Sequence, residues 1–132
     1  MAIYGIGAYY EGRGDVSGQF IGNNIAGVGW DSIEAPELHK FIGSLKVGDI
    51  IYIKAFAPNS PDIIIRGIGF IIDNVIVDSS SSGGLVEAGR HVNWRFTEEF
   101  RIPKPNERNN VRANTLYEEF HPEVQAQIIA RL

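Results

Sequence analysis

Four aromatic side chains have positions that suit the stacking of a flat ring: three end predicted strands beside polar residues, and one lies in a basic segment. Tyr9 and Tyr10 end the first predicted strand, Trp30 ends another, and Trp94 lies in a basic segment. Aromatic faces stack on nucleic-acid bases for roughly 1–3 kcal/mol each. Neighbouring residues of a strand point to opposite faces, so we expect at least one of the two tyrosines to be accessible. Either tryptophan could instead fill the core with its indole N–H bonded inside, and the sequence leaves this open.

Polar residues close to these aromatics are candidates for reading the edge of a ring. A base displayed outside a duplex is held by stacking and by hydrogen bonds to its polar edge. Asp15, Asp31 and Asn93 offer such hydrogen-bonding groups. The remaining phenylalanines on regular apolar patterns are expected in the core: Phe20, Phe41, Phe56 and Phe70.

A basic segment interrupts an otherwise acidic chain. Residues 90–112 hold six Lys/Arg against three Glu, although the net charge of the chain is −4. Such a segment can face phosphates, and Arg90, Arg95 and Arg112 are the candidate contacts. A solvated loop with scattered charges explains the same composition equally well. The acidic total argues against a protein that coats nucleic acid without specificity.

Catalytic and metal-binding patterns are missing from the sequence. The three Gly-x-Gly triplets lack the third glycine of a dinucleotide fingerprint, and there is no Walker A motif or Gly-x-Ser-x-Gly. His39, His91 and His121 are far apart and stand in no metal-ligand spacing. We therefore expect no catalysis, no cofactor and no metal.

The hydrophobic pattern predicts a β-rich chain with short helices. β-Branched runs follow the Gly48-Asp49 pair, which fits a tight turn, and they indicate two adjacent strands buried on both faces. The expected strands cover residues 2–10, 25–30, 49–56, 63–77 and 92–96, and the expected helices cover residues 16–24, 35–44 and 121–132. Residues 11–15 and 79–84 are expected to be loops. Residues 101–110 are expected to be irregular because they carry two prolines.

Length and composition indicate one globular domain over residues 1–132. The chain has no Cys, so disulfides and thiolate metal sites are excluded. No apolar run is long enough to cross a membrane, and the first residues lack the pattern of a signal peptide. We therefore expect a cytoplasmic protein without a membrane partner.

A series of short motifs runs through most of the chain. In order they are Tyr9-Tyr10, Asp15, Phe20-Ile21, Gly27-Val28-Gly29-Trp30, the stretch Lys46 to Lys54, Ile68-Gly69-Phe70-Ile71, and Arg112 to Tyr117 ahead of the terminal helix. This series resembles the EVE-like branch of the PUA-like superfamily. Relatives in pattern include the specificity domains of methylation-dependent restriction and defence proteins.

The resemblance implies an α+β fold, namely a small, bent, mixed β-barrel flanked by short helices and similar to YTH and ASCH domains. Readers in that family hold a modified base in an aromatic cage. Carried onto this chain, the cage candidates are Trp30, Tyr9 and Tyr10, with Trp94 as a further one. Lys54 is expected at the barrel mouth or paired with Asp49.

These observations favour a non-catalytic module that recognises a modified or flipped base in DNA or RNA, together with a restriction or defence partner. Two other classes stay open. One is a pocket for a free nucleotide or related small molecule, as in a sensor or sequestering protein. The other is an assembly module whose aromatics pack at an interface. The base modification and the oligomeric state are left open by the sequence.

Overall fold

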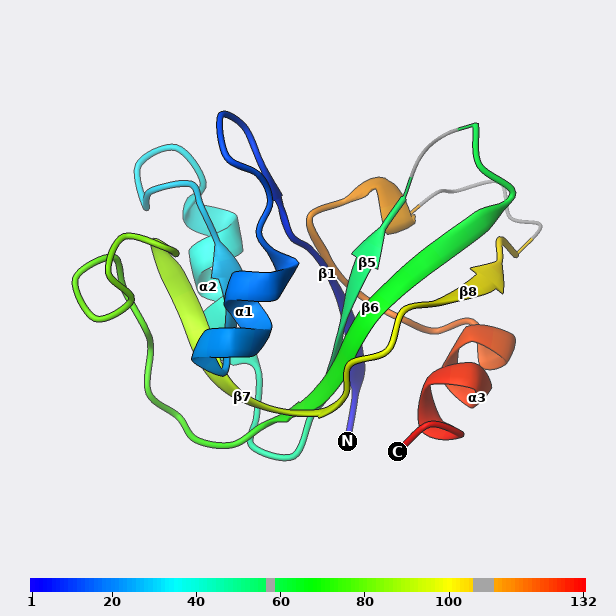
Figure 1. Ribbon diagram of the computed structural model, residues 1–132. Helices are drawn as coiled ribbons and strands as arrows, with labels where there is room; N and C mark the ends of the chain where they lie inside the picture. Colours follow the sequence, from blue (N-terminus) through cyan, green and yellow to red (C-terminus); the bar gives the residue numbers. More distant parts are fainter. Residues whose placement is uncertain (57–58, 106–110) are drawn as a thin grey trace.

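A curled, mixed sheet forms the centre of the computed structural model, which describes residues 1–56, 59–105 and 111–132 (Figure 1). Within these ranges seven strands follow the order β4-β7-β6-β5-β1-β9, with β8 also pairing with β6. They are β1 (Ile3–Gly7), β4 (Ile25–Val28), β5 (Ile50–Ala55), β6 (Asp62–Ile71), β7 (Ala88–Phe96), β8 (Phe100–Pro103) and β9 (Leu116–Glu118). β1 and β5 run parallel, and the other neighbours run antiparallel.

The two β-branched runs form adjacent central strands, as the sequence predicts. β5 and β6 pair from Ile50 opposite Phe70 to Ala55 opposite Ile64. The predicted turn before β5 is also present. Gly48 has a φ of +91°, a conformation that glycine adopts without strain, and the carboxylate of Asp49 accepts a hydrogen bond from the Lys46 N–H at 2.8 Å.

Helices cover both faces of the sheet. Helices α1 (Ser17–Asn23) and α2 (Pro36–Ser44) lie on one side and α3 (Pro122–Ile129) on the other (Figure 1). The alternation along β5 explains this arrangement, because side chains of a strand point to opposite faces in turn. Ile51 and Ile53 join the core with α1 and α2, whereas Ile50 and Tyr52 join the core with α3.

The register shifts twice beside β6, and each shift leaves an arginine as an extra residue. Ile53 lies opposite Gly67 but Lys54 lies opposite Ile65, so Arg66 is extra in β6. In the same way Arg95 is extra in β7, between the partners of Ile68 and Gly69. Such bulges bend a strand and change the direction of a side chain.

Several element boundaries differ from those expected. The first strand breaks at Ala8, so Tyr9–Tyr10 forms a separate strand β2 that pairs with β3 (Gly14–Asp15). β6 ends at Ile71 rather than at residue 77, because the polar residues Asp73 and Asn74 interrupt the apolar run; Val77 keeps only an isolated bridge. β7 begins four residues earlier than expected.

The expected irregular segment also needs correction. Phe100–Pro103 is strand β8, and Pro103 lies at its end, where a missing N–H is tolerated. Residues 106–110 of that segment lie outside the described residues. β3 lies within residues 11–15, which were expected to be a loop, and β9 was not expected. The other helices and strands agree with the expected ranges to within about two residues, except that the C-terminal helix ends at Ile129.

The observed class is α+β, with a half-barrel sheet and short helices. No helix among the described residues is long and apolar enough to pass through a bilayer.

Candidate functional site

Five of the six residues predicted to hold a ring line one pocket of about 340 Å³. They are Tyr9, Tyr10, Asp15, Trp30 and Lys54. The pocket lies where the β2–β3 turn, the end of β5 and the 3-10 helix η1 (Val111–Ala113) meet, at the upper end of the sheet in Figure 1. Residues separated by more than 100 positions therefore contribute to one wall.

The two tyrosines of β2 divide as the alternation predicts. Tyr9 is 77% exposed, whereas Tyr10 is buried and its hydroxyl donates to the carbonyl of Gly27 at 3.1 Å. Burial raises the pKa of Tyr10, so its phenol stays neutral at ordinary pH. Tyr10 thus forms a fixed wall, and Tyr9 offers a free ring face.

Trp30 supplies a second accessible ring. It lies two residues after β4 and is 43% exposed. Its backbone carbonyl is 2.7 Å from Nε2 of His39 in α2, which ties the loop to the helix. A smaller hollow of about 140 Å³ is lined by Tyr9, Tyr10 and Trp30 as well. The three aromatic rings therefore border both hollows.

Lys54 is the basic residue of the inner wall. It is 8% exposed, and its ammonium lies 5.7 Å from the centre of the Tyr117 ring. Among the described residues it makes no hydrogen bond and no ion pair. The expected pairing with Asp49 is wrong, because that carboxylate accepts from the N–H groups of Ala2 and Lys46 at the other end of β5. Burial lowers the pKa of Lys54 to about 8.

Asp15 lines the pocket, but its carboxylate is already engaged. One oxygen accepts from the N–H of Ser17, and the other lies 2.7 Å from Arg66. Arg66 also pairs with Glu99 at 3.2 Å. Asp15 therefore holds α1 and β6 in place and is not a free acceptor for a ligand.

Arg66 is a pocket residue that the sequence reading missed. It is the single charge within the apolar stretch from Ile63 to Ile72, and the bulge turns it toward Asp15. A lone cation inside such a run is a signal of a bulge near a site. The other missed lining residues are Gly7, Ala8, Ala55, Phe56, Ser60, Ile64, Ala113 and Thr115. Phe56 was expected in the core.

Trp94 does not join the pocket. It packs against the core beside α1 and α2, and its indole N–H donates to the carbonyl of Phe20 at 3.1 Å. The core alternative is therefore the correct one for this residue. Asp31 and Asn93 also lie outside the pocket lining, and Asp31 accepts from the N–H groups of Ile33 and Glu34.

Two of the three predicted phosphate contacts are buried. Arg90 is 1% exposed and donates to the carbonyls of Ile42, Leu45 and Asp73, so it caps the end of α2. Arg112 is 2% exposed and pairs with Glu119. Phosphate cannot reach either guanidinium. Arg95 is exposed in its bulge, and its role as a phosphate contact stays a prediction.

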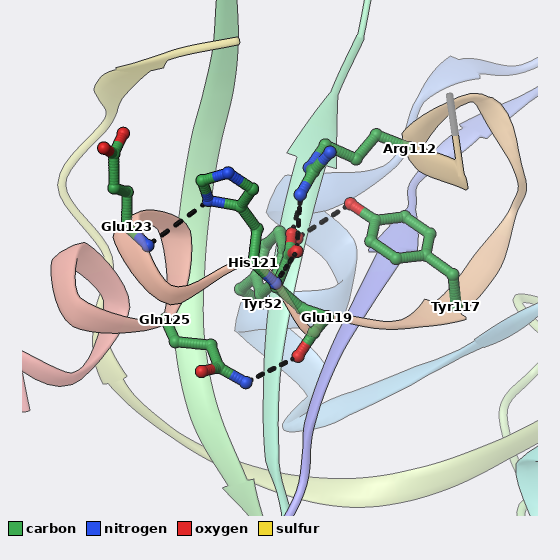
Figure 2. Close-up of polar contacts among 7 residues, drawn as sticks. All are labelled: Tyr52, Arg112, Tyr117, Glu119, His121, Glu123 and Gln125. Carbon is green, nitrogen blue, oxygen red and sulfur yellow. Dashed lines mark hydrogen bonds and ion pairs between the residues drawn. The ribbon is translucent and has the colours of Figure 1, made fainter. Parts of the chain in front are cut away.

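A buried polar network includes the hydroxyl of Tyr117, the residue whose ring lies beside Lys54. Figure 2 shows Tyr52, Arg112, Tyr117 and Glu119 pointing toward one another. The Tyr52 hydroxyl lies 2.8 Å from that of Tyr117 and donates to Glu119 at 2.7 Å. Gly5 sits between the two tyrosines in the sheet, and a Cβ there would lie 2.4 Å from the Tyr117 ring. Within this network Arg112 has a carboxylate partner, Glu119, whereas Lys54 has none among the described residues.

No cluster of His, Asp or Glu suited to a metal ion occurs in the part of the chain that the structure describes. A scan of protein-family models and a search of curated proteins each found no match to this chain. Fold and site together define an α+β protein with an aromatic-rimmed pocket at one end of a half-barrel sheet.

Proposed function

We propose that this chain is a non-catalytic binding module that takes one planar ring into the pocket between Tyr9, Trp30 and Lys54. The leading occupant is a modified base displayed from a nucleic-acid strand, in a fold of the PUA-like, EVE-like type. The observation that carries the proposal is the convergence of these side chains from β2, the β4–α2 loop and β5 on one pocket. Tyr9 and Trp30 stack on the faces of the bound ring, and the inner wall of the pocket, with Lys54, contacts the edge of that ring.

The test is a binding titration of the full chain with oligonucleotides that carry one methylated or hydroxymethylated base. We expect these to bind more tightly than the unmodified strand. Trp30→Ala and Tyr9→Ala each remove one stacking face, so we expect affinity to fall about tenfold. Phe120→Ala is the matched control, because Phe120 is 71% exposed and lies outside this pocket. Equal binding of modified and unmodified strands counts against the proposal.

A free nucleotide or related small molecule is the second candidate, and one observation favours it. The burial of Arg90 and Arg112 removes two of the three phosphate contacts that the sequence suggested for a polymer. A salt titration separates the candidates. Each phosphate contact of a strand adds to the slope of log affinity against log salt, whereas a small ligand gives a shallow slope.

A further inference from the structure

Three basic side chains are buried in the described part of the molecule, and one of them has neither a carboxylate nor a carbonyl partner. Arg90 donates to three carbonyls, and Arg112 pairs with Glu119. Lys54 has only the face of the Tyr117 ring, with its ammonium 5.7 Å from the ring centre. Among the described residues, Arg90 Nε is the one fully buried side-chain polar atom without a hydrogen bond. The Lys54 ammonium instead reaches the pocket, where a ligand can supply the partner that the protein does not.

The neighbours of Lys54 do not supply the missing charge. Asp15 is the carboxylate of the pocket lining, and it is held by Arg66 and by the N–H of Ser17. Arg66 is shared in turn with Glu99. The lining therefore carries Lys54 and Arg66 against Asp15, and the surplus positive charge lies on Lys54.

The ammonium lies close to β1, where a glycine leaves room for a methyl-sized group beside it. Gly7 pairs with Lys54 across the sheet, and a Cβ at Gly7 would lie 3.6 Å from Nζ. The rest of the lining near this point is small or apolar: Ala8, Ala55, Phe56, Ile64 and Ala113. A flat ring entering past Tyr9 and Trp30 thus meets mainly small or apolar side chains, and Lys54 is the cation of the lining that has no carboxylate partner among the described residues.

We propose that the ring bound in this pocket carries a carboxylate on its inner edge and that Lys54 binds this group. The inference rests on the proposed function and names the ligand class for the same site. A single ammonium matches a monoanion. A carboxylate on the ring lies in the plane of the ring that stacks between Tyr9 and Trp30 and so reaches the inner wall, whereas the phosphodiester of a strand, also a monoanion, lies outside the ring. A charge-assisted hydrogen bond in a partly desolvated pocket is stronger than one in water. The lowered pKa of Lys54 agrees with this reading, since an anion would restore the charged form.

Carboxylated pyrimidines are the simplest ligands of this class. They have two sources, a 5-carboxylcytosine within a strand and a free pyrimidine carboxylic acid. The titration therefore uses an oligonucleotide with one 5-carboxylcytosine, the same sequence with 5-carbamoylcytosine, and the free 5-carboxylated nucleoside. The carbamoyl group has the shape of the carboxylate without its charge, so this pair of ligands isolates the charge in the unmodified protein.

We expect the carboxylated strand to bind at least tenfold more tightly than the carbamoyl strand. In Lys54→Met we expect the ratio to fall to about one, while Lys40→Met, an exposed position on α2, keeps it. The free nucleoside identifies the source: binding as tight as that of the strand indicates a small-molecule site with the same chemistry.

The outcomes separate the two proposals. Equal affinity for carboxyl and carbamoyl strands, with binding that still depends on Trp30, overturns the carboxylate and keeps the ring pocket. A tenfold preference that survives in Lys54→Met also overturns the role of Lys54. Absence of binding for every one of these ligands overturns the carboxylate proposal, and the ring pocket is then decided by the titration with methylated and hydroxymethylated strands. The comparison of the two strands needs no variant, so it decides the question even where Lys54→Met does not fold.

Discussion

Two buried basic side chains, Arg112 and Lys54, lie near Tyr117, and their polar surroundings differ. Arg112 pairs with Glu119, which also accepts from Tyr52 and from the N–H of His121, so its charge is matched within the protein (Figure 2). Lys54 approaches the ring of Tyr117 from the pocket side and meets no carboxylate among the described residues. Tyr117 thus separates a matched region from an unmatched one.

The difference indicates two kinds of role. The matched charge fixes the segment that contains η1 and β9 to the sheet, since Arg112 and Glu119 lie at its two ends. The unmatched charge adds nothing to that attachment and faces a pocket bordered by accessible rings. A base that the fold does not neutralise is the better candidate for binding a ligand.

Removing the carboxylate of the matched region is expected to have the largest effect. Glu119→Leu leaves Arg112 buried and without its counter-ion, so we expect unfolding free energy to fall by about 3–5 kcal/mol in guanidinium denaturation. Glu118→Gln, a neighbour that is only half buried, is the control and should change stability by less than about 0.5 kcal/mol.

The double variant Arg112→Met/Glu119→Leu sharpens this result. Because it removes both charges, it should recover much of the stability lost in Glu119→Leu. A loss of under about 1 kcal/mol in the single variant would show that the network is not what holds the segment.

Replacing Lys54, which has no carboxylate partner among the described residues, is expected to raise the free energy of unfolding instead of lowering it. Lys54→Met relieves the burial of a charge and keeps the length of the side chain, so we expect the unliganded protein to gain about 2 kcal/mol at pH 7. Lys40→Met should leave stability unchanged. A destabilised Lys54→Met protein would contradict the comparison, because it would mean that Lys54 is matched within the fold.

The pH dependence of stability tests the same contrast without ligand. Burial lowers the pKa of Lys54 to about 8 from 10.5. Above pH 8 the folded protein therefore releases a proton that the unfolded chain keeps, and stability rises with pH. We expect a gain of about 2 kcal/mol between pH 7 and 9.5, measured by denaturation at each pH, and its loss in Lys54→Met.

The charged and titratable groups near Lys54 do not produce this rise. Burial raises the pKa of Tyr10, Tyr52 and Tyr117, so these phenols lower stability only above pH 10, where the unfolded chain ionises. An identical pH profile for the Lys54→Met protein would contradict the assignment to Lys54.

The sequence predicted the elements that local pattern controls. β5 and the start of β6 follow from their β-branched runs, and the different exposure of Tyr9 and Tyr10 follows from strand alternation. β8 escaped prediction because Pro103 marks irregular chain in a sequence, while in the fold it occupies the end of a strand. The PUA-like, EVE-like identity stays a prediction.

In the candidate site, aromatic residues of the lining could be predicted from the sequence and the surroundings of the arginines could not. Aromatic type and position were enough to select Tyr9, Tyr10 and Trp30. Charge was not enough, because burial depends on tertiary contacts that residue type and spacing do not reveal. Arg90 finds carbonyls of α2 and Asp73, and Arg112 finds a glutamate beyond β9. Arg66 was missed because a bulge, rather than alternation, sets its direction.

Arg66 offers the mildest test of the comparison, since it is matched like Arg112 but open to solvent. Its side chain is 29% exposed, and those of Asp15 and Glu99 are 40% and 55% exposed. Solvent screens such pairs, so Arg66→Gln should lower stability by about 0.5–1 kcal/mol, and the loss should shrink in 1 M NaCl. Chemical denaturation at low and high salt measures both. A loss as large as that of Glu119→Leu would mean that the presence of a carboxylate, rather than burial, sets the size of the effect.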